Sequence, residues 1–452
     1  MQGYRCHNMV IRRFLHTHIP CYLPLRKPQF DTKAIVAQLQ SFLKAVEERD
    51  VVSADELISQ LKLLPEQQKH SNAIDKAIKD IQIRRKKLEA AIKSDQSEAH
   101  TLKQPLKQLK QEFQELTEKQ KTIKDSMLQT CLSLPNLTAT DVPSSEPEVV
   151  SWINPKDNYT ADPRREHQKI MIRKGMVDFQ TASAISGSSW YYLLNEGAML
   201  EHALVNYVSK KARQWGFKMC LPPSIVRNEV IVACGFKPRD MNNERQIYHL
   251  SDTQLGLVAT AEISLAGLGV NRTLDLTTPI GLFGVSRSYR AEAGASGRDT
   301  KGLYRVHEFT KVELFYWAKP EESALLLERL RELQTEIFTE LGLSARVLNM
   351  PKNDLGSPAY KKYDIEVWMP GRGSFGEVSS ASNCTDYQSR RLHTTYMNTK
   401  TGKLDYSHTL NGTAMAIPRV ILAIVENFYD TKNDRINIPE VLRPYMEGLE
   451  YI

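Results

Sequence analysis

The segment that spans residues 31–135 repeats apolar side chains at a spacing that helices packed side by side require. It contains very little glycine or proline, and from Leu102 to Met127 the seam positions step alternately by four and three residues. Gln120 is the one polar position of this series, whose apolar members are Leu102, Leu106, Leu109, Phe113, Leu116, Ile123 and Met127. Because such a repeat keeps one stripe of a helix against a neighbour, the series predicts one helix of a coiled coil.

A second run with the same stepping precedes the first, and Arg85 is its polar interruption. Its apolar members are Ile74, Ile78, Ile81, Leu88 and Ile92. The polar stretch SDQSEAH, residues 94–100, separates the two runs and has the composition of a turn. The sequence therefore predicts an antiparallel helical hairpin of roughly 35 residues per helix, which forms an arm about 50 Å long.

Basic residues outnumber acidic ones along this arm and cluster at Arg84, Arg85, Lys86 and Lys87. A charge run on a coiled coil is usually a solvated face. The functional alternative is a rigid rod that lies along phosphate groups. The sequence leaves both interpretations open.

The first thirty residues differ in composition from the rest of the chain. They contain five basic residues and no acidic one before Asp31. A cationic segment with interspersed apolar residues is typical of a mitochondrial presequence, and the alternative is a basic tail. Loss of these five charges lowers the formal net charge from +7 to +2, so any attraction to nucleic acid must be local. We expect a protein of the mitochondrial matrix.

Four prolines and a serine-rich patch within residues 134–155 end the helical segment. The predicted organisation is a presequence at 1–30, a helical arm at 31–135, a linker at 136–164 and a globular domain at 165–452. In the last part, strand-like runs such as KVELFYW and KYDIEVWM alternate with a few longer helices. The predicted fold class is α+β, with a mainly antiparallel sheet flanked by helices.

Several classes of protein are excluded by what the sequence lacks. The six cysteines form no CxxC pair and no histidine stands at zinc-ligand spacing, so we expect neither zinc nor a disulfide framework. No window approaches about 18 uninterrupted apolar residues, so we expect no membrane span. GxxxxGK[ST] is absent, and no GxGxxG stands between a strand and a helix, which excludes P-loop and Rossmann sites.

The stretch from Ser286 to Trp317 predicts a strand, a glycine-bearing loop and a second strand. Arg290 and Arg305 lie on opposite limbs of this hairpin, where both guanidinium groups can converge on one phosphate. Glu292 and Glu313 can receive an ammonium group or an adenine amine, and Phe309 can stack on a purine. An isolated strand Glu or Arg is more often half of a surface ion pair, so each residue alone is weak evidence.

Five elements in order resemble those of seryl-tRNA synthetases, which are class II enzymes. RAEAGASGRDTKGLYRVHEFTKVE is similar to motif 2, and CLPPSIV is similar to motif 1, whose Pro223 belongs to a dimer interface. VATAEISL carries a Thr-x-Glu element, FGEVSSASNCTDYQSRR resembles the strand that binds metal and ATP, and TLNGTAMAIPRVILAIVEN resembles motif 3. This family also carries an N-terminal antiparallel coiled coil that grips the variable arm of its tRNA.

The resemblance implies ATP, Mg²⁺ and L-serine as ligands. Arg290 would contact the α-phosphate, Arg305 and Arg419 the outer phosphates, and Arg290 and Arg419 would be the catalytic arginines. Glu377 and Ser380 would hold Mg²⁺. The implied ATP-binding residues are Arg290, Glu292, Arg305, Val306, Phe309, Glu377, Val378, Ser379, Ser380 and Arg419. The implied serine-binding residues are Thr260, Ala261, Glu262, Arg290, Glu313, Asn411 and Thr413.

The implied reaction is formation of seryl-adenylate, followed by transfer of the seryl group to tRNA(Ser). The partners implied are tRNA(Ser) at the helical arm and a second copy of the chain in a homodimer. The alternatives are a non-catalytic synthetase-like protein, a coiled-coil scaffold with an unrelated head, and another class II synthetase such as the threonine or proline enzyme. Glu308 and Pro418 depart from the family pattern. We expect His307, His393 and His408 to be structural or surface residues.

Overall fold

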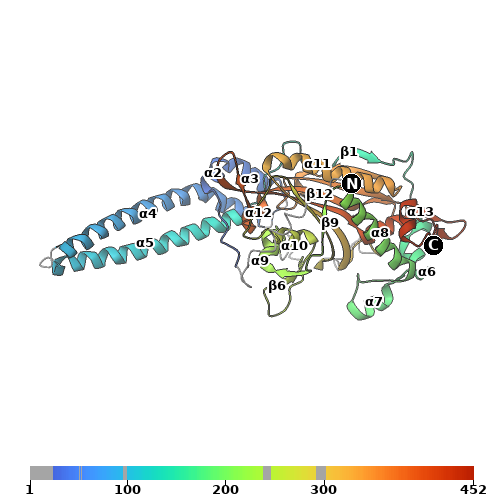
Figure 1. Cartoon of the computed structure of the whole chain (residues 1–452), viewed down its shortest axis with the longest axis horizontal. Coiled ribbons are helices and arrows are strands. Elements are labelled where there is room, and N and C mark those ends of the chain that lie inside the picture. Colours follow the sequence, from blue (N-terminus) through green and yellow to red (C-terminus); the bar gives the residue numbers. More distant parts are fainter. Residues whose placement is uncertain (1–23, 50, 52, 95–98, 238–245, 292–301) are drawn as a thin grey trace, which may run out of the picture.

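The computed structural model describes residues 24–49, 51, 53–94, 99–237, 246–291 and 302–452. Two long helices, α4 (Ala54–Ser94) and α5 (Ala99–Ser133), lie side by side and project from a globular part (Figure 1). They confirm the predicted helical hairpin. Residues 95–98, within the predicted turn, lie outside the described residues.

The two polar residues that interrupt the arm seam, Gln120 and Arg85, both have partners within the arm. Gln120 is buried, and its Nε2 donates hydrogen bonds of 3.1 Å to the carbonyl and the hydroxyl of Ser71. The guanidinium of Arg85 lies 5.3 Å from the ring centroid of Phe113 and forms an ion pair of 3.5 Å with Glu89. Paired polar groups in a seam fix the register of two helices at some cost in stability.

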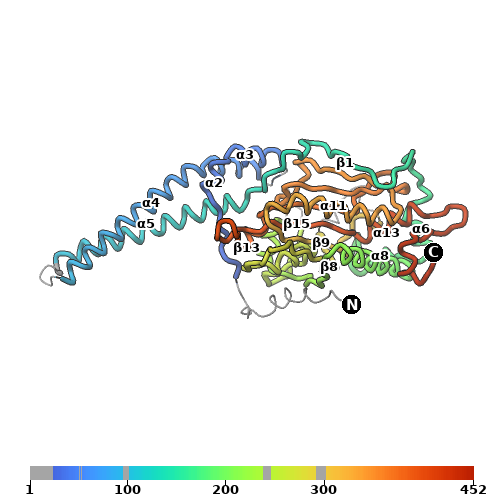
Figure 2. The backbone as a smooth tube through the Cα atoms, turned by 45° about the horizontal axis from the view of Figure 1, so that its top comes forward, coloured from blue at the N-terminus to red at the C-terminus, as the bar shows by residue number. Residues whose placement is uncertain are grey.

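The N-terminal part of the predicted arm is not a continuation of the hairpin. It forms two short helices, α2 (Thr32–Ala37) and α3 (Leu39–Glu47), which lie at the base of the arm (Figure 2). The side chain of Asp31 caps α2 by accepting hydrogen bonds from the next helical N–H groups. An apolar cluster joins these helices to the arm, and its buried members are Ile35, Leu43, Val46, Val51, Leu57, Leu61, Leu64, Met127, Cys131 and Leu134.

Arg49 joins the arm base to the globular part. Its buried guanidinium donates to three carbonyl groups, those of Leu137, Gly356 and Ala359, at 2.8–3.2 Å. Burial lowers the pKa of Arg49 to about 10, which leaves the side chain charged at neutral pH. The arm is therefore anchored by a charged side chain bound to backbone oxygens.

The last residues of the predicted presequence contact the folded protein. The side chain of Lys27 forms an ion pair with Asp125 on α5. The backbone carbonyl of Lys27 lies within hydrogen-bond distance, 2.9 Å, of Nε2 of His393. The carbonyl of Pro24 accepts a hydrogen bond of 3.2 Å from Asn271. Residues 24–30 thus lie between the arm and the globular part, whereas residues 1–23 lie outside the described residues.

The globular part is built on a sheet of eight strands in the order β1-β10-β11-β12-β15-β9-β8-β4. Neighbours pair antiparallel except β4 and β8, which confirms the predicted mainly antiparallel sheet. The strands are β1 (Glu148–Ile153), β4 (Lys218–Cys220), β8 (Ile280–Tyr289), β9 (Glu308–Ala318), β10 (Ala345–Asn349), β11 (Lys361–Met369), β12 (Ser374–Thr385) and β15 (His408–Ala416).

Helices cover this sheet, and smaller strands pair at its margins. The helices are α6 (His167–Arg173), α7 (Phe179–Ser186), α8 (Asn195–Gln214), α9 (Asn228–Ala233), α10 (Ala261–Gly267), α11 (Ser323–Glu340), α12 (Tyr387–Leu392) and α13 (Ile417–Phe428). Three two-stranded sheets pair β2 (Val177–Asp178) with β3 (Tyr192–Leu193), β5 (Ile225–Arg227) with β6 (Leu255–Leu257), and β16 (Tyr429–Asp430) with β17 (Arg435–Ile436). In a three-stranded sheet, β13 (Thr395–Asn398) lies between β7 (Thr273–Leu274) and β14 (Lys403–Tyr406). None of the described helices combines the length and apolarity that a membrane crossing requires.

Strand β9 shows how the sheet separates its apolar core from its polar residues. Side chains alternate between the two faces of a strand. Val312, Leu314 and Tyr316 belong to the core that α8, α11 and α13 share on one face. The side chains of Lys311 and Glu313 therefore lie on the opposite face of the sheet. The buried rings of Phe315 and Trp317, further along β9, lie on that face as well.

Candidate active site

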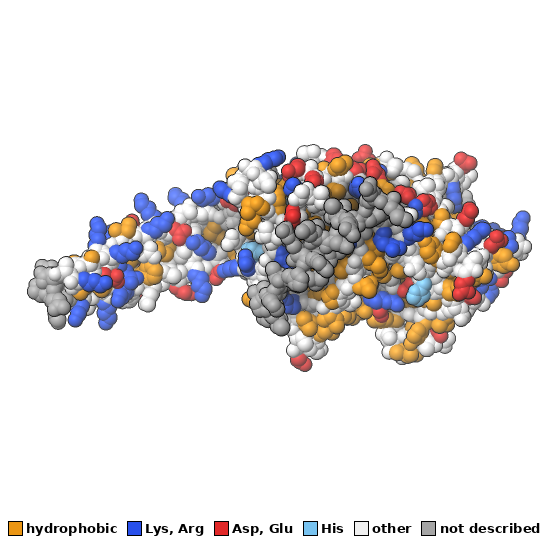
Figure 3. Space-filling model, in the orientation of Figure 1, with side chains coloured by type: hydrophobic (Ala, Val, Ile, Leu, Met, Phe, Trp, Pro, Cys, Tyr) orange, Lys and Arg blue, Asp and Glu red, His pale blue; other side chains and the backbone are white. Residues whose placement is uncertain are grey.

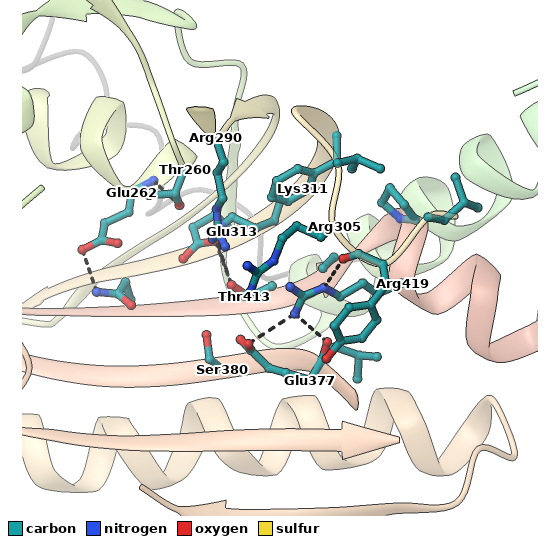
Figure 4. A pocket seen from close by; sticks show the side chains of 18 of the residues that line it. Thr260, Glu262, Arg290, Arg305, Lys311, Glu313, Glu377, Ser380, Thr413 and Arg419 are labelled. Carbon is teal, nitrogen blue, oxygen red and sulfur yellow. Dashed lines mark hydrogen bonds and ion pairs between the residues drawn. The ribbon is translucent and has the colours of Figure 1, made fainter. Parts of the chain in front are cut away.

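A cavity of about 190 Å³ opens on that polar face, where β9, β12 and β15 meet α10 and α13 (Figure 4). Its lining includes thirteen of the predicted site residues: Thr260, Glu262, Arg290, Arg305, Val306, Phe309, Glu313, Glu377, Val378, Ser380, Asn411, Thr413 and Arg419. Ala261 and Ser379 are buried outside the lining, and the hydroxyl of Ser379 donates to the carbonyl of Thr413. Glu292 lies outside the described residues.

The hairpin of β8 and β9 positions Arg290. The ladder continues past β8, because the N–H of Arg290 donates to the carbonyl of His307 at 2.9 Å. The ring of His307 stacks on Trp190, with its Nδ1 2.8 Å from the hydroxyl of Tyr248. These contacts give His307 the predicted structural role. The guanidinium of Arg290 lies 5.4 Å from the ring centroid of Phe309, within the cavity.

Three arginines from three elements point into the cavity (Figure 4). Arg290 follows β8, Arg305 precedes β9, and Arg419 lies in the first turn of α13. Arg419 is held in place because its Nε donates to the carbonyl of Tyr304 at 3.0 Å and its Nη1 donates to the carbonyl of Glu377 at 2.8 Å. A set of guanidinium groups in one cavity is suited to a polyphosphate.

A β-bulge brings Glu377 and Ser380 to the same side of β12. Two residues three positions apart in a regular strand face opposite sides. The ladder between β11 and β12 omits Val378, since Glu366 pairs with Glu377 and Ile365 pairs with Ser379. The extra residue shifts the alternation by one position, so both oxygen-bearing side chains line the cavity.

The carboxylate of Glu377 stays ionised in this setting. Burial raises its pKa, but the positive charges of Arg419, Lys362 and Arg290 outweigh this effect and lower the pKa to about 2. Its Oε2 lies 3.2 Å from Nη1 of Arg419. Glu377 therefore presents a permanent negative charge beside the three arginines.

A second carboxylate, Glu262, lies at the N-terminus of α10. The hydroxyl of Thr260 caps this helix by accepting from the N–H of Glu262 at 3.3 Å. Oε1 of Glu262 accepts hydrogen bonds from Gln388 at 2.6 Å and from Asn411 at 2.8 Å. Burial, and then the nearby charge of Glu313, raise the pKa of Glu262 to about 7.

Lys311 completes this end of the cavity. Its Nζ lies 2.8 Å from Oε2 of Glu313 and 3.4 Å from the hydroxyl of Thr413, and Thr413 in turn donates to Oε2 of Glu313 at 3.3 Å. Lys311 and Glu313 are only 5% and 1% exposed. Among the described residues, these contacts all go to Oε2 of Glu313, and Oε1 remains able to accept a hydrogen bond.

Comparisons with known proteins agree with this geometry. Residues 248–428 match the family model described as tRNA synthetase class II core domain (G, H, P, S and T). Over 98% of the chain and all of the relative, the sequence is 55% identical to the mitochondrial serine--tRNA ligase of Saccharomyces cerevisiae. The chain belongs to the seryl-tRNA synthetases.

Two further comparisons extend this result. The serine--tRNA ligase of Borrelia recurrentis is 42% identical, with 79% of this chain and 84% of that protein covered. A crystal structure of seryl-tRNA synthetase from Pyrococcus horikoshii complexed with ATP is similar with a TM-score of 0.84 and 32% identity, covering 94% of this chain and 99% of that one. The chain is a class II serine--tRNA ligase, and the scaffold alternative is wrong.

The sequence prediction assigned no role to four residues that line the cavity or support it. Phe236 and Tyr304 line the cavity, Lys311 pairs with Glu313, and Gln388 on α12 holds Glu262. Lys311 carried a usable signal, because a lysine two positions before Glu313 in a strand must share its face. Gln388 carried no such signal, because only the tertiary fold brings α12 beside α10.

We expect Lys311→Met to lower the free energy of unfolding by about 3–5 kcal/mol, because it leaves the buried Glu313 without its partner. Urea denaturation measures this change. The double variant Lys311→Met/Glu313→Gln should recover most of the loss, since it removes both charges. A single variant as stable as the wild type, or a double variant no better than the single one, would contradict the role given to this pair.

Proposed function

We propose that the chain activates L-serine with ATP to seryl-adenylate and transfers the seryl group to the 3′ end of tRNA(Ser) in mitochondria. The observation that carries the proposal is that three guanidinium groups and two buried carboxylates share one cavity. The guanidinium groups suit the phosphates of ATP, and the carboxylates suit the ammonium and hydroxyl of serine. The mitochondrial relative that spans nearly the whole chain supports the location.

On the nucleotide side, Phe309 stacks on adenine and Arg290 contacts the α-phosphate. Arg305 and Arg419 hold the outer phosphates. Arg419 binds Glu377 in the described arrangement, so it exchanges this contact for phosphate when ATP binds. The backbone of the bulge in β12, at Val378 and Ser379, lies beside the nucleotide. Glu292 would receive the adenine amine by resemblance.

The residues present fit Mg²⁺ bound together with ATP. Mg²⁺ prefers oxygen ligands, and protein sites often supply one or two carboxylates while phosphates and water complete the shell. Glu377 is ionised and Ser380 shares its side of β12, so these two residues would hold the ion. In the described part of the chain, no group of three or more His, Cys, Asp or Glu residues forms a metal site by itself. When bound, Mg²⁺ supplies neutralisation of phosphate charge.

On the serine side, Thr260 and Glu262 receive the ammonium group. The backbone of Ala261 belongs to the same turn, and Asn411 orients Glu262. Glu313 and Thr413 read the side-chain hydroxyl. A buried carboxylate rejects alanine strongly, because its hydrogen bond would go unmade, whereas exclusion of threonine rests on steric fit, worth about 1–3 kcal/mol.

In the first step, the serine carboxylate attacks the α-phosphorus and expels pyrophosphate. No protein nucleophile is needed, since positioning and electrostatic stabilisation lower this barrier. Arg290 lies between the serine and nucleotide ends of the cavity and stabilises charge on the α-phosphate. In the second step, a ribose hydroxyl of the terminal tRNA adenosine attacks the seryl carbonyl carbon, and AMP leaves.

The surfaces of the chain suit the two macromolecular partners. Lys and Arg side chains occur along the length of the arm, which fits contact with tRNA phosphates (Figure 3). Strand β4 is an edge of the sheet, and Met219 on this strand and Leu221 and Ile225 after it are 47–76% exposed. An exposed apolar surface at a sheet edge suits a second copy of the chain. Because residues 24–30 contact the folded protein, the removable presequence ends within residues 1–23.

The first test is serine-dependent exchange of labelled pyrophosphate into ATP by protein lacking residues 1–23. We expect exchange with serine, a much slower rate with threonine, and none with alanine. Absence of exchange with serine, in protein shown to be folded, would favour a non-catalytic synthetase-like protein. Threonine activated as fast as serine would contradict the assignment of Glu313 and Thr413.

The pKa of Glu262 predicts a pH dependence. Because this pKa is about 7, a fraction of the protein molecules without serine carries a protonated Glu262 near neutral pH. An ammonium ion binds the carboxylate, so the proton must leave, and KM for serine should rise as the pH falls below 7, by up to about tenfold per unit. Exchange kinetics between about pH 6 and pH 8 measure this change. Glu262→Gln should raise KM for serine and remove its pH dependence; a pH dependence retained by that variant would contradict the assignment.

The arm is tested by Arg84→Ala/Lys86→Ala/Lys87→Ala. These residues lie on α4 of the arm, which projects away from the globular part that holds the cavity, so we expect unchanged pyrophosphate exchange. We expect kcat/KM for tRNA(Ser) to fall by roughly tenfold and to depend less on salt, because fewer phosphates are contacted. The control is the variant Lys400→Ala/Lys403→Ala, whose two exposed lysines lie where the chain turns from β13 into β14. Equal aminoacylation by both variants would place tRNA elsewhere.

A further inference from the structure

A buried histidine outside the cavity lining holds the chain just before Arg305. His167 on α6 and Glu426 on α13 are 6% and 0% exposed, with Nδ1 of His167 2.9 Å from Oε1 of Glu426. The N–H of Leu303 points at the other ring nitrogen, Nε2, at 3.2 Å. A backbone N–H can only donate, so Nε2 accepts, and the neutral ring donates from Nδ1 to Glu426.

The approach of the imidazole to the chain requires a glycine. Gly302 has a φ of +65°, and a Cβ there would lie 2.1 Å from Nε2 of His167. Any larger residue would displace the ring or the backbone. The contact between His167 and Leu303 is thus supported by a second, independent feature.

Helix α13, which carries Glu426, also holds Tyr304, the residue after Leu303. The carbonyl of Tyr304 accepts from Arg419, and its ring centroid lies 4.5 Å from the guanidinium of Arg419 and 3.7 Å from that of Arg372. The N–H of Arg372 donates to Oε2 of Glu426 at 3.1 Å. Arg419 and Glu426 are two turns apart on α13 and share a face. Helix α13 therefore fixes residues 303 and 304 at two points.

We propose that His167 is a positioning residue for ATP binding. By accepting the N–H of Leu303 while Glu426 fixes its ring, His167 sets the direction in which the chain enters β9. Arg305 follows two residues later, and from this backbone position its guanidinium points into the cavity. The inference rests on the proposed function, in which those phosphates belong to ATP. Loss of the Nε2 acceptor should weaken ATP binding and leave serine binding unchanged.

Two substitutions distinguish the roles of the two ring nitrogens of His167. His167→Asn keeps an N–H near the position of Nδ1 but provides no acceptor for Leu303. His167→Gln places its side-chain oxygen near the position of Nε2 and keeps the acceptor. We expect His167→Asn to raise both the calorimetric Kd for ATP and KM for ATP about tenfold, since a buried N–H is left unpaired. We expect His167→Gln to stay within about threefold of the wild type, and KM for serine to stay unchanged in both.

Wild-type affinity for ATP in His167→Asn would overturn the proposal. So would equal weakening of ATP and serine in both variants together with a lowered Tm, because that pattern indicates general loss of structure. If His167→Asn does not fold, Gly302→Ala tests the same contact and should raise Kd for ATP without changing KM for serine. A wild-type protein that binds ATP but shows no serine-dependent exchange would refute the proposed function and leave this contact testable by ATP affinity.

Discussion

The register of β9 between its neighbours β8 and β15 determines which charged side chains meet. Glu313 pairs with Thr413 on one side and with Gly284 on the other, and Lys311 shares its face. A shift of one residue would turn both charges into the apolar core under α8, α11 and α13. Because that core is large and fully buried, the shift is strongly disfavoured. The core thus fixes the polar arrangement on the opposite face.

The cavity separates its charges along its length (Figure 4). Thr260 and Glu262 lie at one end, Glu377 and Arg419 lie at the other, and Arg290 lies between them. The carboxylate of Glu262 at the first end attracts a cation, while the guanidinium of Arg419 at the second attracts phosphate. In the proposed reaction, this division orients the amino acid and the nucleotide head to head, with their reacting atoms near Arg290. Orientation of this kind lowers the barrier without a protein nucleophile.

The site residues of the hairpin could be proposed from the sequence because their types stand in order around one predicted turn, whereas the other site residues were implied by the resemblance to seryl-tRNA synthetases. Arg290, Arg305, Phe309 and Glu313 belong to this hairpin. Strand alternation places Phe309 and Glu313 on one face, whereas Arg290 and Arg305 lie just outside the two strands. The bulge at Val378 could not be predicted from strand alternation, although the resemblance paired Glu377 with Ser380. The pairing of Lys311 with Glu313 was not predicted, because a lysine in a strand is usually an exposed residue. The predicted arm also included residues that form the separate helices α2 and α3.

The sequence alone determined the hairpin of α4 and α5, the antiparallel sheet and the family, because these follow from local periodicity and from motifs of contiguous residues. Only the tertiary structure decided that Gln388 holds Glu262, that Arg49 anchors the arm, and that His167 and Glu426 hold the chain before Arg305. Each of these contacts joins residues more than a hundred positions apart. Their partners are chosen by how helices pack on the sheet, which no local pattern in the sequence encodes.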